Sequence, residues 1–266
     1  MRACALPVGG VAAALLFASV VPLWTSVRGV AGPTVMDSER PLLAALATIG
    51  AFAGATVLAI VVARAVNAVV GTFVLGCGVA LLSMRTGCAV DLAHGGTNLV
   101  HSAIEAGGWC VLVAAASWAI YSLGGRLPDF PKTGDDEIDS PTGPSARRAW
   151  IAAVAALVVA WFALVTDTKG QALGAATAGA FAAGFIARSL ARETQPVYVA
   201  AATVAAFAAM LGYIAFSIRG DLSVGLIDGS FPRLLRIMPV DAAAGALLGT
   251  SMGVGFARSF VSPTES

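Results

Sequence analysis

Residues 42–63 read LLAALATIGAFAGATVLAIVVA, an apolar run without a charged residue that follows Pro41 and stops at Arg64. A helix needs about 20 predominantly apolar residues to cross the hydrocarbon core of a bilayer. This segment therefore predicts a transmembrane helix, and seven others resemble it. The eight predicted spans are 8–23, 42–63, 66–83, 108–123, 149–165, 171–187, 197–216 and 240–256.

The composition of the whole chain agrees with this interpretation. Of the 266 residues, 58% are hydrophobic and 12% are charged, whereas a soluble domain has about 25% charged residues. The core of a single soluble domain stops growing at roughly 250–300 residues and could not bury this much apolar surface. The numbers exclude a soluble enzyme, a nucleic-acid-binding protein and a disordered chain. They predict an all-α, polytopic transmembrane helical bundle surrounded by lipid.

The longest polar stretch, residues 124–148, combines prolines with acidic residues, which is typical of a solvated linker. It separates residues 1–123 from residues 149–266 and leaves four predicted spans in each half. The halves show a faint similarity, because Arg85 precedes Glu105 by 20 residues and Arg219 precedes Asp241 by 22. Two interpretations stay open. Either the halves are parallel repeats about an axis along the membrane normal, or charged helix ends simply resemble one another.

The basic residues predict an orientation. If the amino terminus and the loops after the second, fourth and sixth spans share one side, that side has nine lysines and arginines and the other has seven. The positive-inside rule then places both termini in the cytoplasm and the loops 24–41, 84–107 and 217–239 outside. Abundant alanine, glycine and valine with only two lysines indicate a GC-rich coding sequence, hence a bacterial plasma membrane. We expect the first span to be an uncleaved helix, the alternative being a signal peptide.

Except for Asp241, the second residue of the last one, the predicted spans contain no Asp, Glu, Lys, Arg or His. Ion-coupled carriers and proton pumps place such residues inside the membrane, so we expect no charge-coupled chemistry there and no cofactor. Small residues recur instead: Gly245, Gly249 and Gly253 lie on one helix face and predict a close helix contact, within the bundle or between subunits. Residues 249–253 also match G-x-S-x-G, but a hydrolase nucleophile requires a strand-to-helix turn. We interpret the motif as packing.

Two loops carry candidate binding residues. In the loop 84–107, the residues Asp91, His94, Asn98, His101 and Glu105 would form one polar stripe on a helix. Imidazoles and carboxylates suit a transition metal, so Asp91, His94, His101 and Glu105 are candidate ligands. However, His94 and His101 would lie about 10 Å apart along a helix, and two glycines interrupt the stripe. The alternative is an amphipathic helix with a solvated polar face.

The loop 217–239 carries Arg219, Arg233 and Arg236. The last two share a face if the segment is helical, with leucines opposite. This pattern favours a helix at the membrane surface whose arginines contact lipid phosphates or an anionic solute. A simple amphipathic connector is the alternative.

Three functions fit these observations. The first is a non-catalytic scaffold or accessory subunit, with a membrane-protein partner or a second copy of the chain, because no complete catalytic set is present. The second is a passive carrier of a small neutral or lipidic solute along a path between the halves. The third is a metal-dependent membrane enzyme that uses the residues of the loop 84–107. A polar cavity at mid-membrane would favour transport, and a solid bundle would favour a scaffold.

Overall fold

The computed structural model describes residues 2–95, 98–124, 144–190, 194–217 and 222–260. Within these ranges the chain is helical, with two isolated β-bridges but no β-strand. The long helices are α1 (Arg2–Ala18), α2 (Pro41–Ala65), α3 (Ala68–Arg85), α5 (Leu99–Leu123), α6 (Pro144–Ala163), α7 (Lys169–Leu190), α8 (Pro196–Ser217) and α10 (Pro239–Ala257). The short helices are η1 (Val21–Trp24), η2 (Val35–Asp37), α4 (Ala89–Gly95), α9 (Leu222–Asp228) and η3 (Arg233–Arg236).

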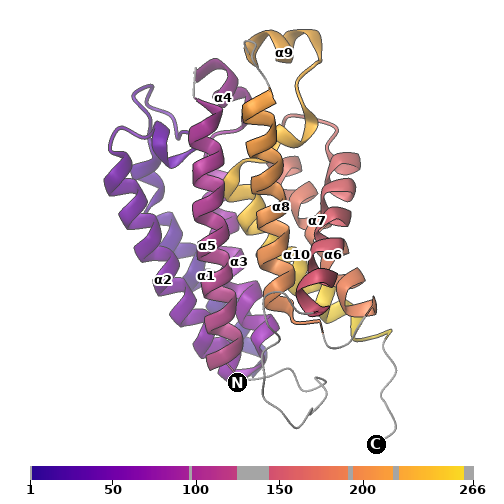
Figure 1. Cartoon of the computed structure of the whole chain (residues 1–266). Helices are drawn as coiled ribbons and strands as arrows, with labels where there is room; N and C mark the ends of the chain where they lie inside the picture. Colours follow the sequence, from indigo (N-terminus) through magenta and orange to yellow (C-terminus); the bar gives the residue numbers. More distant parts are fainter. Residues whose placement is uncertain (1, 96–97, 125–143, 191–193, 218–221, 261–266) are drawn as a thin grey trace, which may run out of the picture.

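The long helices form one elongated bundle (Figure 1). Each predicted span overlaps one of them, and seven are long and apolar enough to cross a membrane. The apolar part of α1, Cys4–Ala18, is shorter, and α1 packs against α2 and α3. The prediction of an all-α membrane bundle is therefore confirmed. We call the end that carries α4 and α9 the cap end, and the opposite end, where α1 begins and α10 ends, the terminal end.

Local sequence explains where several helices begin. Pro41, Pro196 and Pro239 are each the first residue of a helix, a position that needs no backbone N–H and suits the fixed φ of proline. The side chain of Asn67 accepts a hydrogen bond from the Val70 N–H and caps α3. These signals separate consecutive apolar segments that hydropathy alone would merge, such as α2 and α3.

The order of the α-helices in the two halves is the same, apart from the short 3-10 helices. Three long helices, one seven-residue helix and a fourth long helix follow one another in α1–α5 and again in α6–α10. Across the halves, α3 packs on α10, and the corresponding pair, α8 and α5, also packs together. The short helices α4 and α9 contact each other at the cap end (Figure 1). Such reciprocal pairing is expected of parallel repeats. Most of the predicted linker, residues 125–143, lies outside the described residues.

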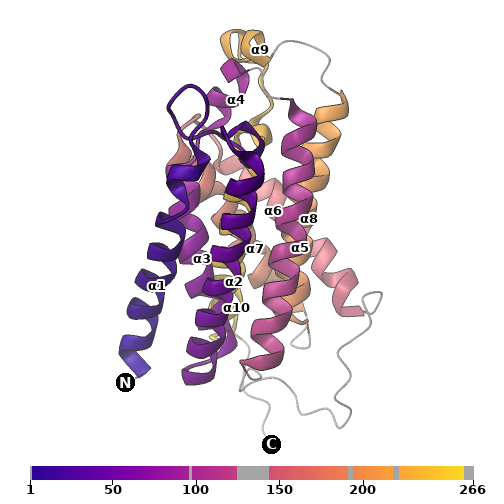
Figure 2. The ribbon, with the colours of Figure 1, turned by 90° about the vertical axis from the view of Figure 1, so that its left-hand side faces the viewer.

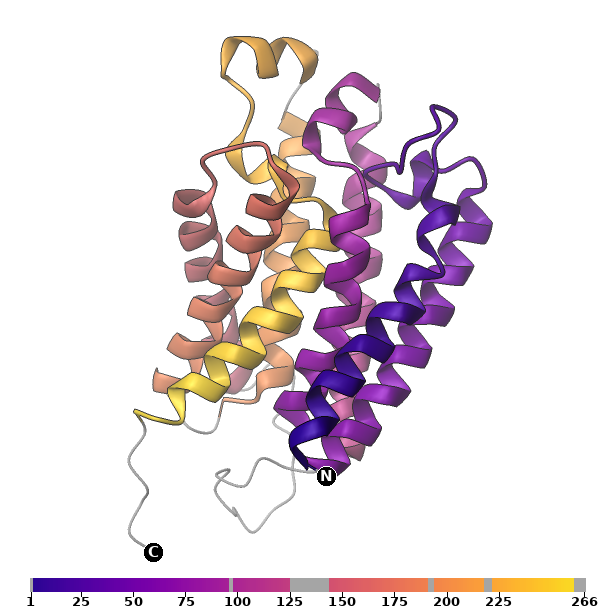
Figure 3. The same cartoon turned by 180° about the vertical axis from the view of Figure 1, so that it is seen from behind.

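Helix α10 is the most buried of the long helices. It runs obliquely past α7 and α3 (Figure 3). Gly245, Gly249 and Gly253 face α7, and an added Cβ at Gly245 would lie 2.6 Å from Ala176 Cβ. Small residues thus let the two backbones approach closely, and van der Waals packing stabilises the pair in lipid.

Candidate functional site

A buried ion pair lies at the cap end, between the two halves. The Lys169 ammonium, on the first residue of α7, is 2.8 Å from Asp241 Oδ1. The Ser83 hydroxyl of α3 donates to the same oxygen at 2.6 Å. The Asp241 side chain is fully buried, whereas that of Lys169 is 13% exposed. We call Ser83, Lys169 and Asp241 the polar cluster; it ties α3 of the first half to α7 and α10 of the second.

Asp241 and Lys169 each have a further partner in the backbone. Asp241 Oδ2 accepts a hydrogen bond from the Met238 N–H at 3.0 Å and caps α10. Lys169 also donates to the Gly87 carbonyl oxygen at 2.9 Å. A buried charge is costly unless it is paired and hydrogen-bonded. Here the Asp241 carboxylate accepts from three donors, which offset the cost of burying its charge.

The packing around Gly87 explains why the ammonium meets the main chain there. An added Cβ at Gly87 would lie 2.8 Å from the Pro33 nitrogen and 2.9 Å from the Ala31 carbonyl oxygen. The Gly87 N–H donates to the Gly32 carbonyl at 3.0 Å. The close approach of two backbones therefore requires glycine and fixes the acceptor of Lys169.

Glu105 holds the loop between α1 and α2 against the bundle. Its Oε2 accepts from the Val35 N–H at 2.7 Å, and its Oε1 accepts from Trp109 Nε1 at 3.2 Å. In the same region, Arg28 donates to the His94 carbonyl oxygen at 3.0 Å. Figure 2 shows this loop folded beside α4. Glu105 near the start of α5 and Asp241 near the start of α10 thus each connect separate segments of the chain at the cap end.

The structure does not bring the four predicted metal ligands together. The expected single helix is instead two, because α4 ends at Gly95 and α5 begins at Leu99 with Asn98 as its cap. The carboxylate of Asp91 accepts the Cys88 N–H, His94 Nδ1 lies 2.9 Å from the Val90 carbonyl, and Glu105 is engaged as described above. His101 is exposed. Within the described part of the chain, no group of three His, Cys, Asp or Glu side chains could hold a metal ion.

The arginines of the second loop have partners inside the protein. The Arg233 guanidinium lies 4.8 Å from the centre of the Trp161 ring. Arg236 Nε is 2.7 Å from Asp167 Oδ1, so it ties η3 to the loop before α7. Arg219 lies outside the described residues. The predicted contact of these arginines with lipid phosphate or an anion stays a prediction.

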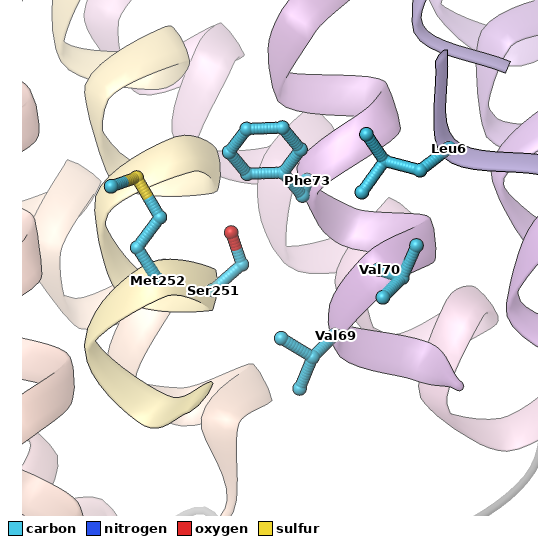
Figure 4. A pocket seen from close by; sticks show the side chains of 6 residues that line it. All are labelled: Leu6, Val69, Val70, Phe73, Ser251 and Met252. Carbon is cyan, nitrogen blue, oxygen red and sulfur yellow. The ribbon is translucent and has the colours of Figure 1, made fainter. Parts of the chain in front are cut away.

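The G-x-S-x-G segment lies in the middle of α10. The Ser251 hydroxyl donates to the Leu248 carbonyl at 2.8 Å within its own helix. It borders an apolar groove between α10, α3 and α1 (Figure 4). The groove is lined by Leu6, Val69, Val70, Phe73, Ser251 and Met252. These side chains offer a surface for an apolar molecule and contain no base for a serine nucleophile.

The residues of the polar cluster were not predicted as a site. The sequence places both Asp241 and Glu105 close to the start of a predicted span after a polar loop, but it does not pair either with Lys169. The usable signal is that Lys169 is one of two lysines in the chain and precedes an apolar span.

Comparison with known proteins found no matching family model, no similar curated protein and no similar solved structure. Function is therefore argued from the arrangement of the residues themselves.

Proposed function

We propose that this integral membrane protein is a non-catalytic scaffold or accessory subunit of a membrane complex. The observation that carries the proposal is an uncovered row of small residues on α7. Gly170, Gly174 and Ala178 are exposed, four residues apart, and an added Cβ at either glycine would meet nothing within 4 Å. Such rows let a second transmembrane helix approach closely.

The remaining faces of α7 are already used inside the bundle. Gly184 packs on Thr250 of α10, and Gly179 packs on Ala156 of α6. Because small residues on the other faces serve helix contacts, the exposed row is the part of α7 left for another chain. In the described part of the chain, most buried side chains are apolar, and the groove is apolar too. An apolar interior favours a structural role over passage of a polar solute.

Native mass measurement in mild detergent tests the proposal. We expect the wild-type protein to carry a partner or a second copy, and Gly174→Leu to release it, because the added side chain blocks close approach. Gly50→Leu is the matched control, since Gly50 is an exposed glycine of α2 with nothing within 4 Å. A wild-type protein that is always a lone monomer, or equal loss of the partner in both variants, would contradict the proposal.

A second candidate is a passive carrier of a lipidic solute, supported by the position of the groove. The groove lies where α3 of the first half meets α10 of the second, and carriers built from repeats bind solutes between the repeats. Proteoliposomes that contain a fluorescent phospholipid would show transbilayer movement, and Val69→Trp would fill the groove and slow it. Movement no faster than in protein-free liposomes would exclude this candidate for phospholipids.

A further inference from the structure

The junction between α3 and α10 differs between its two ends. At the cap end the polar cluster joins Ser83 to Asp241. One level deeper, an added Cβ at Gly76 would lie 2.9 Å from Leu248 Cδ2, so the helices are in close contact there. Toward the terminal end the same helices line the open groove of Figure 4, with Met252 47% exposed. The junction is thus closed by polar contacts at one end and loosens at the other.

In the described part of the chain, three polar contacts at the cap end of this junction converge on two atoms, Lys169 Nζ and Asp241 Oδ1. The Lys169 ammonium reaches Gly87 of the first half and Asp241 of the second, and Asp241 Oδ1 receives both Lys169 and Ser83. Removing Lys169 would leave a buried carboxylate without its counter-charge, which favours entry of water. The Lys169 side chain is already partly exposed, so water has a short path to the pair.

We propose that the polar cluster is a releasable lock, and that breaking it opens the α3–α10 junction from the cap end. In the locked state, the junction is accessible only through the apolar groove at the terminal end. In the released state, Val79, which is fully buried one turn below Ser83 on α3, becomes accessible to water from the cap end. This inference does not depend on a partner protein or on transport.

A cysteine reporter at position 79 tests the lock. In full-length protein with Cys4, Cys77, Cys88 and Cys110 replaced, Val79→Cys would be modified by a water-soluble methanethiosulfonate in detergent micelles. We expect Lys169→Met to raise the modification rate by about tenfold or more. Losing a hydrogen-bonded charge pair shifts an equilibrium by at least about this factor. Lys169→Arg retains the charge, so the modification rate should stay near the rate of the protein that keeps Lys169.

The matched control is Arg236→Met. It removes another cap-end ion pair, with Asp167, but both partners belong to the second half. The rate at position 79 should therefore not change. Ser83→Ala, a milder change within the cluster, should raise the rate about two- to fivefold, since a single hydrogen bond contributes less than the ion pair. It provides the test if Lys169→Met does not fold.

Two results would overturn the inference. The first is equal protection of the cysteine in Lys169→Met and Arg236→Met, with both proteins folded by circular dichroism. The second is an unchanged rate in Ser83→Ala when Lys169→Met is unfolded. Native mass is unaffected by either outcome, so failure of the lock and failure of the proposed scaffold function are distinguishable.

Discussion

The contact between α7 and α10 predicts a large difference between two identical substitutions. In Gly249→Ala, the new Cβ would lie 2.7 Å from both Ala180 Cβ and the Phe181 nitrogen, and it would overlap the Thr177 carbonyl oxygen. Ordinary carbon contacts are about 3.5–4.0 Å, so the helices must separate by about 1 Å. Backbone atoms cannot move aside as a flexible side chain does, because both belong to packed helices.

The expected magnitude combines two opposing effects. Replacing glycine by alanine in a helix stabilises it by about 1 kcal/mol, whereas overpacking costs about 1–3 kcal/mol, and more where the backbone must shift. We expect Gly249→Ala to lower the free energy of unfolding by about 2 kcal/mol. Gly174→Ala, on the exposed face of α7 with nothing within 4 Å, should raise it by up to about 1 kcal/mol.

Unfolding in mixed micelles of increasing SDS content, followed by tryptophan fluorescence, measures both variants under the same conditions. The expected gap between them is about 3 kcal/mol. If Gly249→Ala unfolds at the same SDS fraction as Gly174→Ala, or at a higher one, the close packing of α7 on α10 described above is wrong.

Three further predictions concern the cap end. Lys169→Met should lower the free energy of unfolding by about 3–5 kcal/mol in the same assay. Adding Asp241→Leu should recover part of this loss, because it removes the lone buried carboxylate. If the effects of the two substitutions simply add in the double variant, the ion pair is contradicted. Trp24→Phe should cost about 1 kcal/mol, since the indole N–H donates to buried Thr48 Oγ1 at 3.0 Å, and an unchanged midpoint would argue against this bond. Burial raises the pKa of the Cys88 thiol. The rate of maleimide labelling of Cys88 in the folded protein should therefore still rise with pH in the range where the rate in the SDS-unfolded protein is already constant. Identical pH profiles for the two states would contradict this burial.

The fold was predictable because apolar run length alone identifies helices in a membrane. All eight predicted segments overlap long helices. Their ends were less accurate. Helix α5 begins at Leu99, whereas the predicted span begins at residue 108, because a rule that excludes charged residues and histidines from spans stops short of His101 and Glu105. Glu105 can continue the helix at the cap end because the Val35 N–H and Trp109 indole satisfy it.

The polar cluster could not be predicted in the same way. Ser83 and Asp241 are 158 residues apart in the chain and meet only because α3 packs on α10. In a soluble bundle, the apolar stripe of each helix indicates which face is buried. In these helices apolar residues surround the whole circumference, so periodicity does not reveal which helices are neighbours. Small-residue spacing indicated that α10 has a close partner, but it could not say that the partner is α7.

The burial of α10 has a consequence for biosynthesis. Ribosomes make the other long helices of the bundle before α10, and α10 then contacts α3, α5, α7 and α8. Until it inserts, the face of α7 that packs on α10 lacks its neighbour, and the Lys169 ammonium lacks Asp241. Among the described long helices, the most buried one therefore joins the bundle last. An intermediate that waits for α10 is the stage at which membrane chaperones and proteases would recognise the nascent chain.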